Sequence, residues 1–456
     1  MRKPLSEVTS LSLLIEAGAA AGRVVATRDH ALFLDDFATA SLFGDDLDAL
    51  EGRSVVLFVG DMAMAVAALI DLDGWARRIV LCPPGWDAAK LASVVIDAEA
   101  DALVHDAERE APKVDVPLFA PCRLPMRPLR KRPVATRRTE WVLPTSGTSG
   151  PPKLVVHTLD SLMGAIGAAP TQQWATFYDV RRYGGLQIFL RALAGQGSLQ
   201  LSGVDESVDS FLSRLGDGEI THISGTPSHW RKVLMSANAR RIDPDYVRLS
   251  GEIANDSVLE SLRALYPRAR VEHAYASTEA GVVFSVDDGQ AGFPAAWLAR
   301  KGAVEMKIVD GALRVRSSRI ASRFLGADAP PLTDEDGFID TGDMVERRGE
   351  RLYFVGRRGG IINVGGAKVH PEEVEAVLNA HAAVRASRVF ARRNPIVGAL
   401  VVGEVVLRDA QVSRDGLERD ILAACRAHLP AHMTPALLRF VADLPMTDAG
   451  KLARHG

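Results

Sequence analysis

The run Arg53-Ser-Val-Val-Leu-Phe-Val59 ends in five consecutive apolar residues and predicts a buried strand. It opens a regular alternation along the chain. We expect an Ala/Met-rich helix over 61–75, a strand over Arg78-Ile-Val-Leu81, a helix over 87–99 and a strand over 102–104. Strands and helices that alternate at this spacing form a largely parallel sheet with helices packed against it. The sequence therefore predicts an α/β fold.

The alternation resumes beyond residue 170 and changes character near residue 300. The expected strands are 173–178, 198–202, 220–224, 246–250 and 270–275, and the expected helices are 185–194, 207–215, 228–236 and 256–265. Short β-like runs at 305–309 and 313–316 then predict a β-rich subdomain. The tail returns to helices at 371–380 and 415–428 and strands at 385–391 and 397–407. We expect a large domain over 1–355, made of helix-covered mixed sheets plus the β-rich subdomain, and a small, mobile α+β domain over 356–456.

Composition argues against several classes of function. Of the 456 residues, 47% are hydrophobic and 24% are charged, as in soluble globular proteins. The net charge of −3 gives no basis for binding nucleic acid or a membrane surface, and no apolar run approaches the roughly 20 residues of a membrane helix. The three cysteines are scattered, which argues against a disulfide framework or a zinc cluster and fits the cytoplasm. The basic segment 121–138 is interpreted as a solvated connector rather than a polyanion site, because no aromatic residues interleave it.

A loop rich in glycine and hydroxyl residues, Thr145-Ser-Gly-Thr-Ser-Gly-Pro-Pro-Lys153, separates two apolar stretches. Glycine allows the backbone to approach a ligand closely, and consecutive N–H groups and hydroxyls can surround phosphate oxygens with the lysine as counter-charge. The loop does not match the P-loop pattern, because two prolines precede the lysine and Leu154 follows it. The sequence predicts a phosphate-binding loop here, with a flexible surface loop as the alternative.

Four further motifs follow this loop in order. They are Ala274-Tyr-Ala-Ser-Thr-Glu279, Asp336-Gly-Phe-Ile-Asp-Thr-Gly-Asp343, the stretch from Gly356-Arg357 to Pro371-Glu-Glu-Val-Glu375, and Leu444-Pro-Met-Thr-Asp-Ala-Gly-Lys-Leu-Ala-Arg454. With these five motifs the chain resembles, over roughly residues 50–454, the ATP-dependent adenylate-forming superfamily. That superfamily includes acyl- and aryl-CoA synthetases, peptide-synthetase adenylation domains and luciferases.

The resemblance implies an ATP site built from the first two motifs. The loop would close over the β- and γ-phosphates with Thr145, Ser146, Gly147, Thr148, Ser149, Gly150 and Lys153. Thr278 would donate to the α-phosphate, and Tyr275 would pack on adenine. Glu279 is interpreted as a Mg²⁺ ligand, because a bare carboxylate beside triphosphate would repel it. Gly251 and Glu252 resemble the segment that passes alongside adenine.

The later motifs supply the remaining nucleotide contacts. A carboxylate can accept two hydrogen bonds from a cis-diol, and the resemblance assigns this role on the ribose to Asp343. Arg357 would reach the ribose or a phosphate. Gly366 would lie where the pantetheine arm of CoA passes. Lys451 is the catalytic candidate, because an ammonium group offsets the charge that builds as a carboxylate attacks the α-phosphorus.

The same motifs depart from the family pattern in two places. The family's hinge acid corresponds to Gly359, and a common lysine corresponds to Asn363. We expect a hinge at 356–360 that is unusually loose, with an ordinary hairpin turn as the alternative.

The acyl pocket is expected around Arg182, Tyr183, Gly184 and Thr226. Arg182 stands where the family often has a histidine or aromatic guard. Arg181 or Arg182 would either read a second acidic group on the substrate, face solvent or pair with Asp179. His229 is either a helix-start residue or a ligand.

The sequence thus predicts an acid–thiol ligase with ATP, Mg²⁺ and CoA. It would convert a small-molecule carboxylic acid to acyl-AMP and then to a thioester. A separate acyl carrier protein is the alternative acceptor, and a non-catalytic nucleotide-binding module is the distant alternative.

Overall fold

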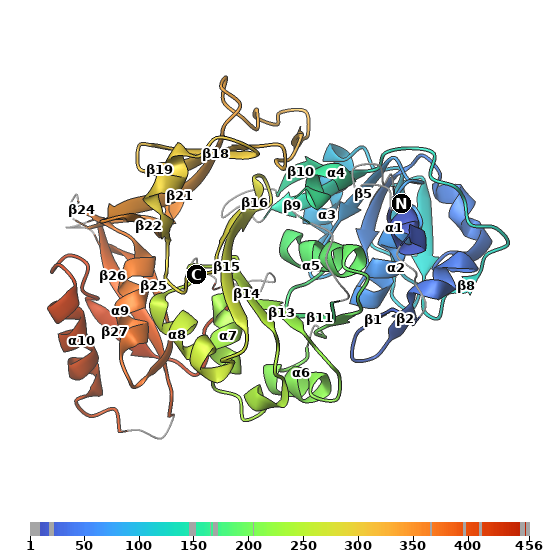
Figure 1. The fold of residues 1–456 in the computed structure, drawn as a ribbon. Helices are drawn as coiled ribbons and strands as arrows, with labels where there is room; N and C mark the ends of the chain where they lie inside the picture. Colours follow the sequence, from blue (N-terminus) through green and yellow to red (C-terminus); the bar gives the residue numbers. More distant parts are fainter. Residues whose placement is uncertain are drawn as a thin grey trace. The chain divides into compact units, whose positions relative to one another are not determined.

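The structure is a computed structural model that describes residues 10–17, 22–145, 152–164, 166, 172–203, 205–364, 367–394, 398–409, 413–446 and 452. Figure 1 shows its helices and strands along the chain. The chain forms two compact units. Unit 1 comprises Met1–Gly251, Leu262–Asp287 and Arg316–Ile339, and unit 2 comprises Glu252–Ser261, Asp288–Val315 and Asp340–Gly456. Within the described part, every helix is too short or too polar to cross a bilayer.

A seven-stranded sheet forms the first half of unit 1, in the order β20-β10-β9-β5-β4-β6-β7. Its strands are β4 (Ser54–Phe58), β5 (Arg78–Leu81), β6 (Ala102–Asp106), β7 (Leu118–Cys122), β9 (Glu140–Thr145), β10 (Lys153–His157) and β20 (Arg323–Leu325). The strands from β9 to β7 are parallel, whereas β10 and β20 are antiparallel additions. The predicted parallel alternation is therefore confirmed.

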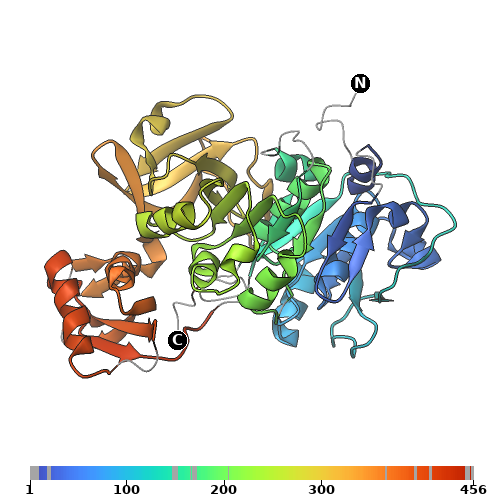
Figure 2. The same ribbon diagram turned by 60° about the horizontal axis from the view of Figure 1, so that its bottom comes forward.

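The two faces of this sheet bury alternate residues of the same strand. Val55 and Leu57 of β4 pack in one core with Val66 of α2 (Met62–Leu72). Val56 packs in a second core with Leu91 of α3 (Ala88–Asp97). A strand covered on both faces must be apolar throughout, which is why the run at 53–59 lacks polar alternation. Helices accordingly flank the blue strands on both sides (Figure 2).

An eight-stranded sheet forms the second half of unit 1, in the order β16-β15-β14-β13-β11-β12-β1-β2. Its strands are β1 (Val24–Ala26), β2 (Ala31–Phe33), β11 (Trp174–Thr176), β12 (Leu199–Leu201), β13 (His222–Gly225), β14 (Tyr246–Ser250), β15 (Arg270–Ser277) and β16 (Gly281–Val286). The associated helices are α1 (Leu11–Ala17), α4 (Leu159–Met163), α5 (Tyr183–Ala194), α6 (Val208–Leu215) and α7 (Pro227–Val233). Helix α8 (Asp256–Leu265) begins in unit 2 and ends in unit 1. The five predicted strands are confirmed here, and β1, β2 and β16 were not predicted.

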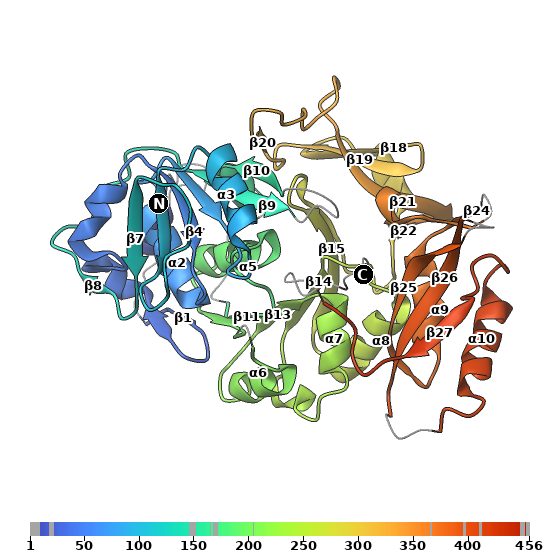
Figure 3. The same cartoon turned by 180° about the vertical axis from the view of Figure 1, so that it is seen from behind.

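Unit 2 holds a five-stranded sheet and the C-terminal α+β segment. The sheet has the order β17-β22-β21-β19-β18, formed by β17 (Phe293–Pro294), β18 (Val304–Val309), β19 (Ala312–Ser317), β21 (Ile339–Arg348) and β22 (Arg351–Arg357). The C-terminal elements are β23 (Ile362–Val364), β24 (Ala367–Val369), α9 (Pro371–Ala380), β25 (Val384–Asn394), β26 (Gly398–Leu407), α10 (Leu417–His428) and β27 (Leu437–Phe440). Buried residues of α9, α10 and β25–β27 share one core, and Figure 3 shows both helices beside this sheet. The predicted β-rich and α+β segments are confirmed.

The basic connector is tied to its own unit. Arg132 donates to the buried carboxylate of Asp71 at 2.8 Å and to the backbone oxygen of Ala40 at 2.9 Å. Arg127 and Arg130 pair with Asp46 and Asp45 at 3.0 Å and 3.1 Å. These arginines bind the segment to the rest of unit 1, as expected of a connector. Arg132, however, is bound by protein groups rather than solvated.

Candidate functional site

The glycine-rich loop begins and ends on paired strands. Thr145, the last residue of β9, lies opposite Lys153, the first residue of β10. The hydroxyl of Thr145 donates to the carbonyl oxygen of Lys153 at 3.4 Å. The exposed Lys153 ammonium lies 5.3 Å from the centre of the Phe324 ring. The structure thus fixes both ends of the loop, whereas Ser146, Gly147, Thr148, Ser149 and Gly150 lie outside the described residues.

The turn after β15 carries Thr278 and Glu279 and is anchored by a buried histidine. Nε2–H of His157 donates to the carbonyl oxygen of Thr278 at 2.7 Å, and the Ser161 hydroxyl lies 2.9 Å from Nδ1. Burial lowers the pKa of His157 to about 4, which keeps the imidazole neutral near pH 7. His157 thus positions the backbone of Thr278, a role that the sequence analysis did not predict.

The side chain of Glu279 is half-buried and, within the described part of the chain, makes no ion pair. Its carbonyl oxygen accepts from the N–H of Ala321 at 2.9 Å, which fixes the turn from the other side. No group of three acidic, histidine or cysteine side chains among the described residues could hold a metal by itself. Mg²⁺ is commonly bound by one or two carboxylates together with substrate phosphates, so a single uncommitted glutamate fits it.

The predicted adenine residues of unit 1 lie at the carboxyl ends of neighbouring strands. Gly251 follows β14 with a φ of 86°, a left-handed conformation that favours glycine. Tyr275, in β15, packs against Phe284 of β16 with ring centres 5.5 Å apart. Ligands of parallel α/β sheets bind at this edge, and the adenine roles of both residues stay predictions.

Arg181 and Arg182, for which the sequence analysis left several roles open, precede α5 and have different surroundings. Arg181 is 2% exposed and makes two 2.8 Å contacts with the carboxylate of Asp179. It also donates to the carbonyl oxygens of Val59 and Gly60 at 2.7 Å and 2.8 Å. Arg181 is therefore committed to the fold, and the hypothesis that it pairs with Asp179 is confirmed.

The predicted pocket residues Arg182, Tyr183 and Gly184 form the first turn of α5 and its N-cap. Arg182 is the N-cap residue and is half-buried. Tyr183 is buried, and its ring lies 5.7 Å from that of His157. Burial raises the pKa of the Tyr183 hydroxyl, so this group stays protonated.

Thr226, the fourth predicted pocket residue, is the N-cap of α7. Its hydroxyl accepts from the N–H of His229 at 3.1 Å, and Nδ1 of His229 accepts from the N–H of Thr226 at 3.2 Å. This reciprocal pair is a capping box. The helix-start interpretation of His229 is thus confirmed.

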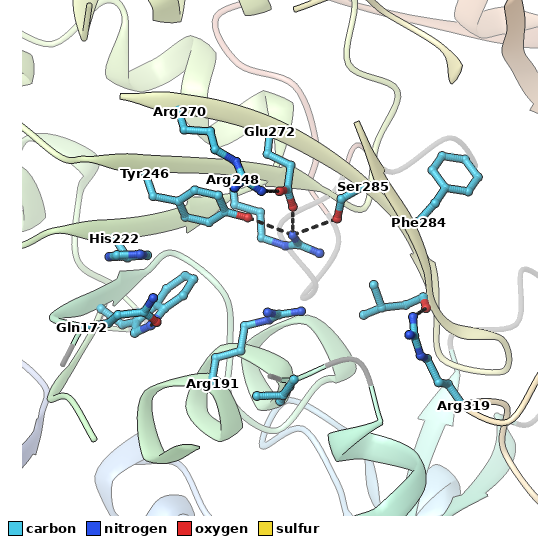
Figure 4. A pocket seen from close by; sticks show the side chains of 13 residues that line it. Gln172, Arg191, His222, Tyr246, Arg248, Arg270, Glu272, Phe284, Ser285 and Arg319 are labelled. Atoms are coloured by element: carbon cyan, nitrogen blue, oxygen red, sulfur yellow. Dashed lines mark hydrogen bonds and ion pairs between the residues drawn. The ribbon is translucent and has the colours of Figure 1, made fainter. Parts of the chain in front are cut away.

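A cavity of about 580 Å³ lies against one face of the eight-stranded sheet, opposite α5 (Figure 4). Its floor consists of two rows of residues that are paired across the strands. The first row is Trp174, His222, Tyr246 and Arg270, and the second is Arg248 and Glu272. The aromatic rings of the first row lie 4.9 Å to 5.8 Å apart. The cavity is thus aromatic at one side and charged at the other.

Glu272 is the centre of a buried polar network in this cavity. Arg248 hydrogen-bonds its carboxylate as well as the hydroxyls of Tyr246 and Ser285 at 3.1 Å and 3.2 Å, and Arg270 donates to the carboxylate at 2.7 Å. Burial raises the pKa of Glu272, but Arg248 and the hydrogen bonds outweigh burial and leave it below the usual range. Glu272 is therefore ionised.

The sequence analysis missed these cavity residues, although a signal was present. In β14 and β15, polar residues alternate with apolar ones, at Tyr246, Arg248 and Ser250 and at Arg270 and Glu272. Interior parallel strands are usually apolar on both faces. A polar face on such a strand indicates that the face lines a site rather than a core.

Unit 2 carries the predicted ribose residues side by side. Asp343 of β21 lies opposite Arg357 of β22, and Nε of Arg357 donates to its carboxylate at 2.9 Å. Arg357 also donates to the carbonyl oxygen of Thr341 at 3.1 Å. Glu252 also belongs to unit 2, whereas Gly366 and Lys451 lie outside the described residues.

Comparison with known proteins agrees with this geometry. The chain is 26% identical over 353 residues to a probable non-canonical nonribosomal peptide synthetase, CymA, of Salinispora arenicola (strain CNS-205), covering 69% of this chain but only 4% of that protein. It is 26% identical over 340 residues to a 2-succinylbenzoate–CoA ligase of Listeria innocua serovar 6a, covering 70% and 69% of the two chains.

The fold matches that of solved structures. The anthranilate CoA ligase AuaEII in complex with anthranoyl-AMP superposes with a TM-score of 0.78 and 16% identity, over 99% of this chain and 97% of that one. The α/β fold with its large and small parts is thereby confirmed. The AMP-binding enzyme C-terminal domain matches residues 373–451. Because the AMP-binding enzyme family matches residues 46–317, well over half of the chain, the protein belongs to that family.

Proposed function

We propose that the protein is an AMP-forming acid–thiol ligase. It would join a carboxylic acid to AMP with release of pyrophosphate, and then transfer the acyl group to a thiol with release of AMP. The observation that carries the proposal is the β15–β16 turn, where His157 holds the backbone of Thr278 and the half-buried Glu279 follows with no ion-pair partner among the described residues. Membership of the AMP-binding family supports it.

Several described residues would each contact the nucleotide. Lys153 would neutralise the outer phosphates, and Thr278 would donate to the α-phosphate. Asp343 would accept hydrogen bonds from both ribose hydroxyls. Its carboxylate would then either keep the hydrogen bond from Arg357 in addition or lose it. Glu279 would hold Mg²⁺ together with the phosphates, and the cation would supply charge neutralisation when it is bound.

Lys451 would complete the first half-reaction. Its ammonium would contact the attacking carboxylate and the phosphorane oxygens, where charge develops in the transition state. Loss of one such contact typically costs roughly 100- to 1000-fold in rate. In the second half-reaction the tail would move and bring the Gly366 region to the acyl-AMP, which is the role that the family resemblance gives to this domain.

CoA is our leading acceptor, because a CoA ligase is among the relatives that match more than two thirds of their own length. A carrier protein is the second candidate. Two relatives favour a carrier protein. They are the nonribosomal peptide synthetase, of which this chain covers 4%, and an isonitrile lipopeptide synthase of Streptomyces coeruleorubidus, of which it covers 23%. We place the reaction in the cytoplasm, because the three buried cysteines are free thiols.

Pyrophosphate release with MgATP tests the proposal. The panel contains aryl, short-chain, long-chain and dicarboxylic acids, each with and without CoA. Release with one acid class supports the ligase, and faster steady turnover with CoA identifies the acceptor. ATP binding without pyrophosphate release from any acid would favour a non-catalytic nucleotide-binding protein instead.

The variant Lys451→Ala tests the division of labour, with Lys368→Ala as a control for an exposed lysine of the same unit. We expect Lys451→Ala to abolish acyl-AMP formation and to spare thioester formation from supplied acyl-AMP. Equal loss of both steps would contradict the role given to Lys451.

A further inference from the structure

Four arginines line the cavity beside α5, but only one carboxylate does so among the described residues. The arginines are Arg191, Arg248, Arg270 and Arg319, and the carboxylate is Glu272. Glu272 is shared by Arg248 and Arg270, and Arg270 also pairs with Asp287 at 3.3 Å. The cavity therefore holds more cationic than anionic side chains, and the excess comes from Arg191 and Arg319.

Among the four arginines, Arg191 is the one with a buried nitrogen that lacks a hydrogen-bond partner. It reaches from α5 toward Arg248, with its guanidinium facing the buried network across the cavity (Figure 4). Its Nε is buried without a hydrogen-bond partner, and no described residue makes an ion pair with it. Burial and the nearby Arg248 lower its pKa to about 10, so the side chain remains charged at neutral pH. A charged guanidinium with a buried nitrogen that lacks a partner is unfavourable for folding, which suggests that Arg191 serves a ligand.

Arg319 approaches the same cavity from the segment behind the β15–β16 turn. Its Nη1 donates to the carbonyl oxygen of Val282 at 3.3 Å, and within the described part it has no carboxylate partner. Val282 is the second residue of β16, the strand that follows the turn that carries Glu279. The cavity and the proposed reaction centre therefore share one strand pair.

We propose that this cavity receives a second anionic group of the acid substrate, and that Arg191 and Arg319 bind it. The proposal rests on the ligase function above and narrows its substrate to an acid with two anionic ends. Guanidinium groups bind carboxylate, sulfonate or phosphonate by the same charge-assisted hydrogen bonds, so all three remain open. The aromatic row of Trp174, His222 and Tyr246 on the floor of the cavity supplies flat surfaces on which a ring between the two anionic ends would pack.

The length of the substrate follows from the strand geometry. Gly251 directly follows the carboxyl end of β14, and Arg248, which Arg191 faces across the cavity, lies three residues earlier. At about 3.3 Å per residue this part of the strand spans about 10 Å, and we expect an acid of about that length. A ring with one short unsaturated arm has this span.

Matched probes test the charge requirement. We would measure pyrophosphate release and calorimetric binding with 4-carboxycinnamate, its ester at the ring carboxyl group, 4-sulfocinnamate and cinnamate. Because a charged hydrogen bond is worth roughly 10- to 150-fold in binding, we expect at least a tenfold preference for the two dianionic acids over the ester and cinnamate. The sulfonate and carboxylate arms identify which anion is preferred. Equal or better binding of the ester would overturn the proposal.

Variants then assign the preference to residues. Arg191→Met and Arg319→Gln should remove most of the discrimination, whereas exposed Arg123→Gln should leave it intact. Arg191→Met should not lower the thermal midpoint, because it removes a guanidinium whose Nε is buried without a hydrogen-bond partner. Discrimination that survives in both variants would overturn the assignment.

The two proposals fail in different ways. Pyrophosphate release from 4-carboxycinnamate that Arg191→Met does not alter keeps the ligase and removes the anion site. Arg191-dependent binding of the dianion without any pyrophosphate release keeps the anion site and removes the ligase.

Discussion

At the scale of single residues, buried polar groups in unit 1 fall into two kinds. Arg181 is saturated by Asp179 and two backbone carbonyl oxygens, whereas Arg191 lacks an ion-pair partner among the described residues. Both are arginines of the same segment of sequence, and no local pattern distinguishes them. Only their partners show that one stabilises the fold and the other is available to a ligand.

His157 makes the stability of unit 1 dependent on pH. Its pKa is about 4 when folded and about 6.5 when unfolded, so between these values the unfolded chain binds a proton that the folded chain does not. Stability should be complete above pH 6.5 and should fall as pH decreases toward 4. The full effect is about 3 kcal/mol for a shift of this size.

Urea unfolding at pH 7.5 and pH 5, followed by tryptophan fluorescence, measures this dependence. His157→Gln keeps a donor for the Thr278 carbonyl oxygen but cannot titrate, so its unfolding free energy should change less with pH than that of the wild type. His229 also has a pKa lowered to about 4 by burial, so some dependence should remain in the variant. Equal pH dependence in both proteins would exclude His157 as a contributor.

At the scale of elements, the local hydrophobic pattern was enough to predict the bounds of helices and strands that carry their own periodicity. The strand at 246–250 and the helices at 256–265 and 371–380 have the predicted bounds. The cavity could not be predicted in this way, because its rows arise from the register of β11, β13, β14 and β15. Residues up to 96 positions apart, from Trp174 to Arg270, meet only through that pairing.

The start of α5 should tolerate a methyl group at one glycine and not at the next. A Cβ at Gly185 would lie 2.2 Å from the carbonyl oxygen of Asp179, whereas a Cβ at Gly184 would lie 3.4 Å from the nearest atom of Tyr178. We expect Gly185→Ala to lose about 1–3 kcal/mol of unfolding free energy through overpacking. Gly184→Ala should be neutral or gain up to about 1 kcal/mol through helix propensity.

Thermal unfolding of both variants checks this, since they differ by one position and the same methyl group. A lower midpoint for Gly184→Ala than for Gly185→Ala would contradict the described approach of α5 to the Asp179 loop. The result also separates structure from function, because Gly184 is a predicted pocket residue and its variant is expected to alter the KM for the acid.

At the scale of the whole molecule, the predicted hinge at 356–360 lies inside unit 2. Arg348 of β21 pairs with Glu373 of α9 at 3.0 Å, and an added Cβ at Gly356 would lie 2.4 Å from the Glu372 carboxylate. These contacts join the five-stranded sheet to the C-terminal segment in this conformation. Movement of the tail between the half-reactions would have to break these contacts. The flexibility of the backbone at 356–360 should therefore limit the rate of thioester formation.

Gly359 and Gly360 allow that freedom to be reduced without a clash. Neither has a left-handed backbone, and no atom lies within 4 Å of an added Cβ at either position. Alanine at such sites stabilises by about 0.4–1 kcal/mol each, chiefly by restricting the unfolded chain. The same restriction would slow rotation at the predicted hinge. We expect Gly359→Ala/Gly360→Ala to raise the thermal midpoint and slow thioester formation several-fold, while single-turnover pyrophosphate release stays unchanged. Gly85→Ala in unit 1, also free of contacts, is the matched control and should affect neither rate. If the thermal midpoint rises while thioester formation stays at the wild-type rate, the rotation occurs elsewhere in the chain. The backbone at 359–360 would then have become stiffer without slowing thioester formation.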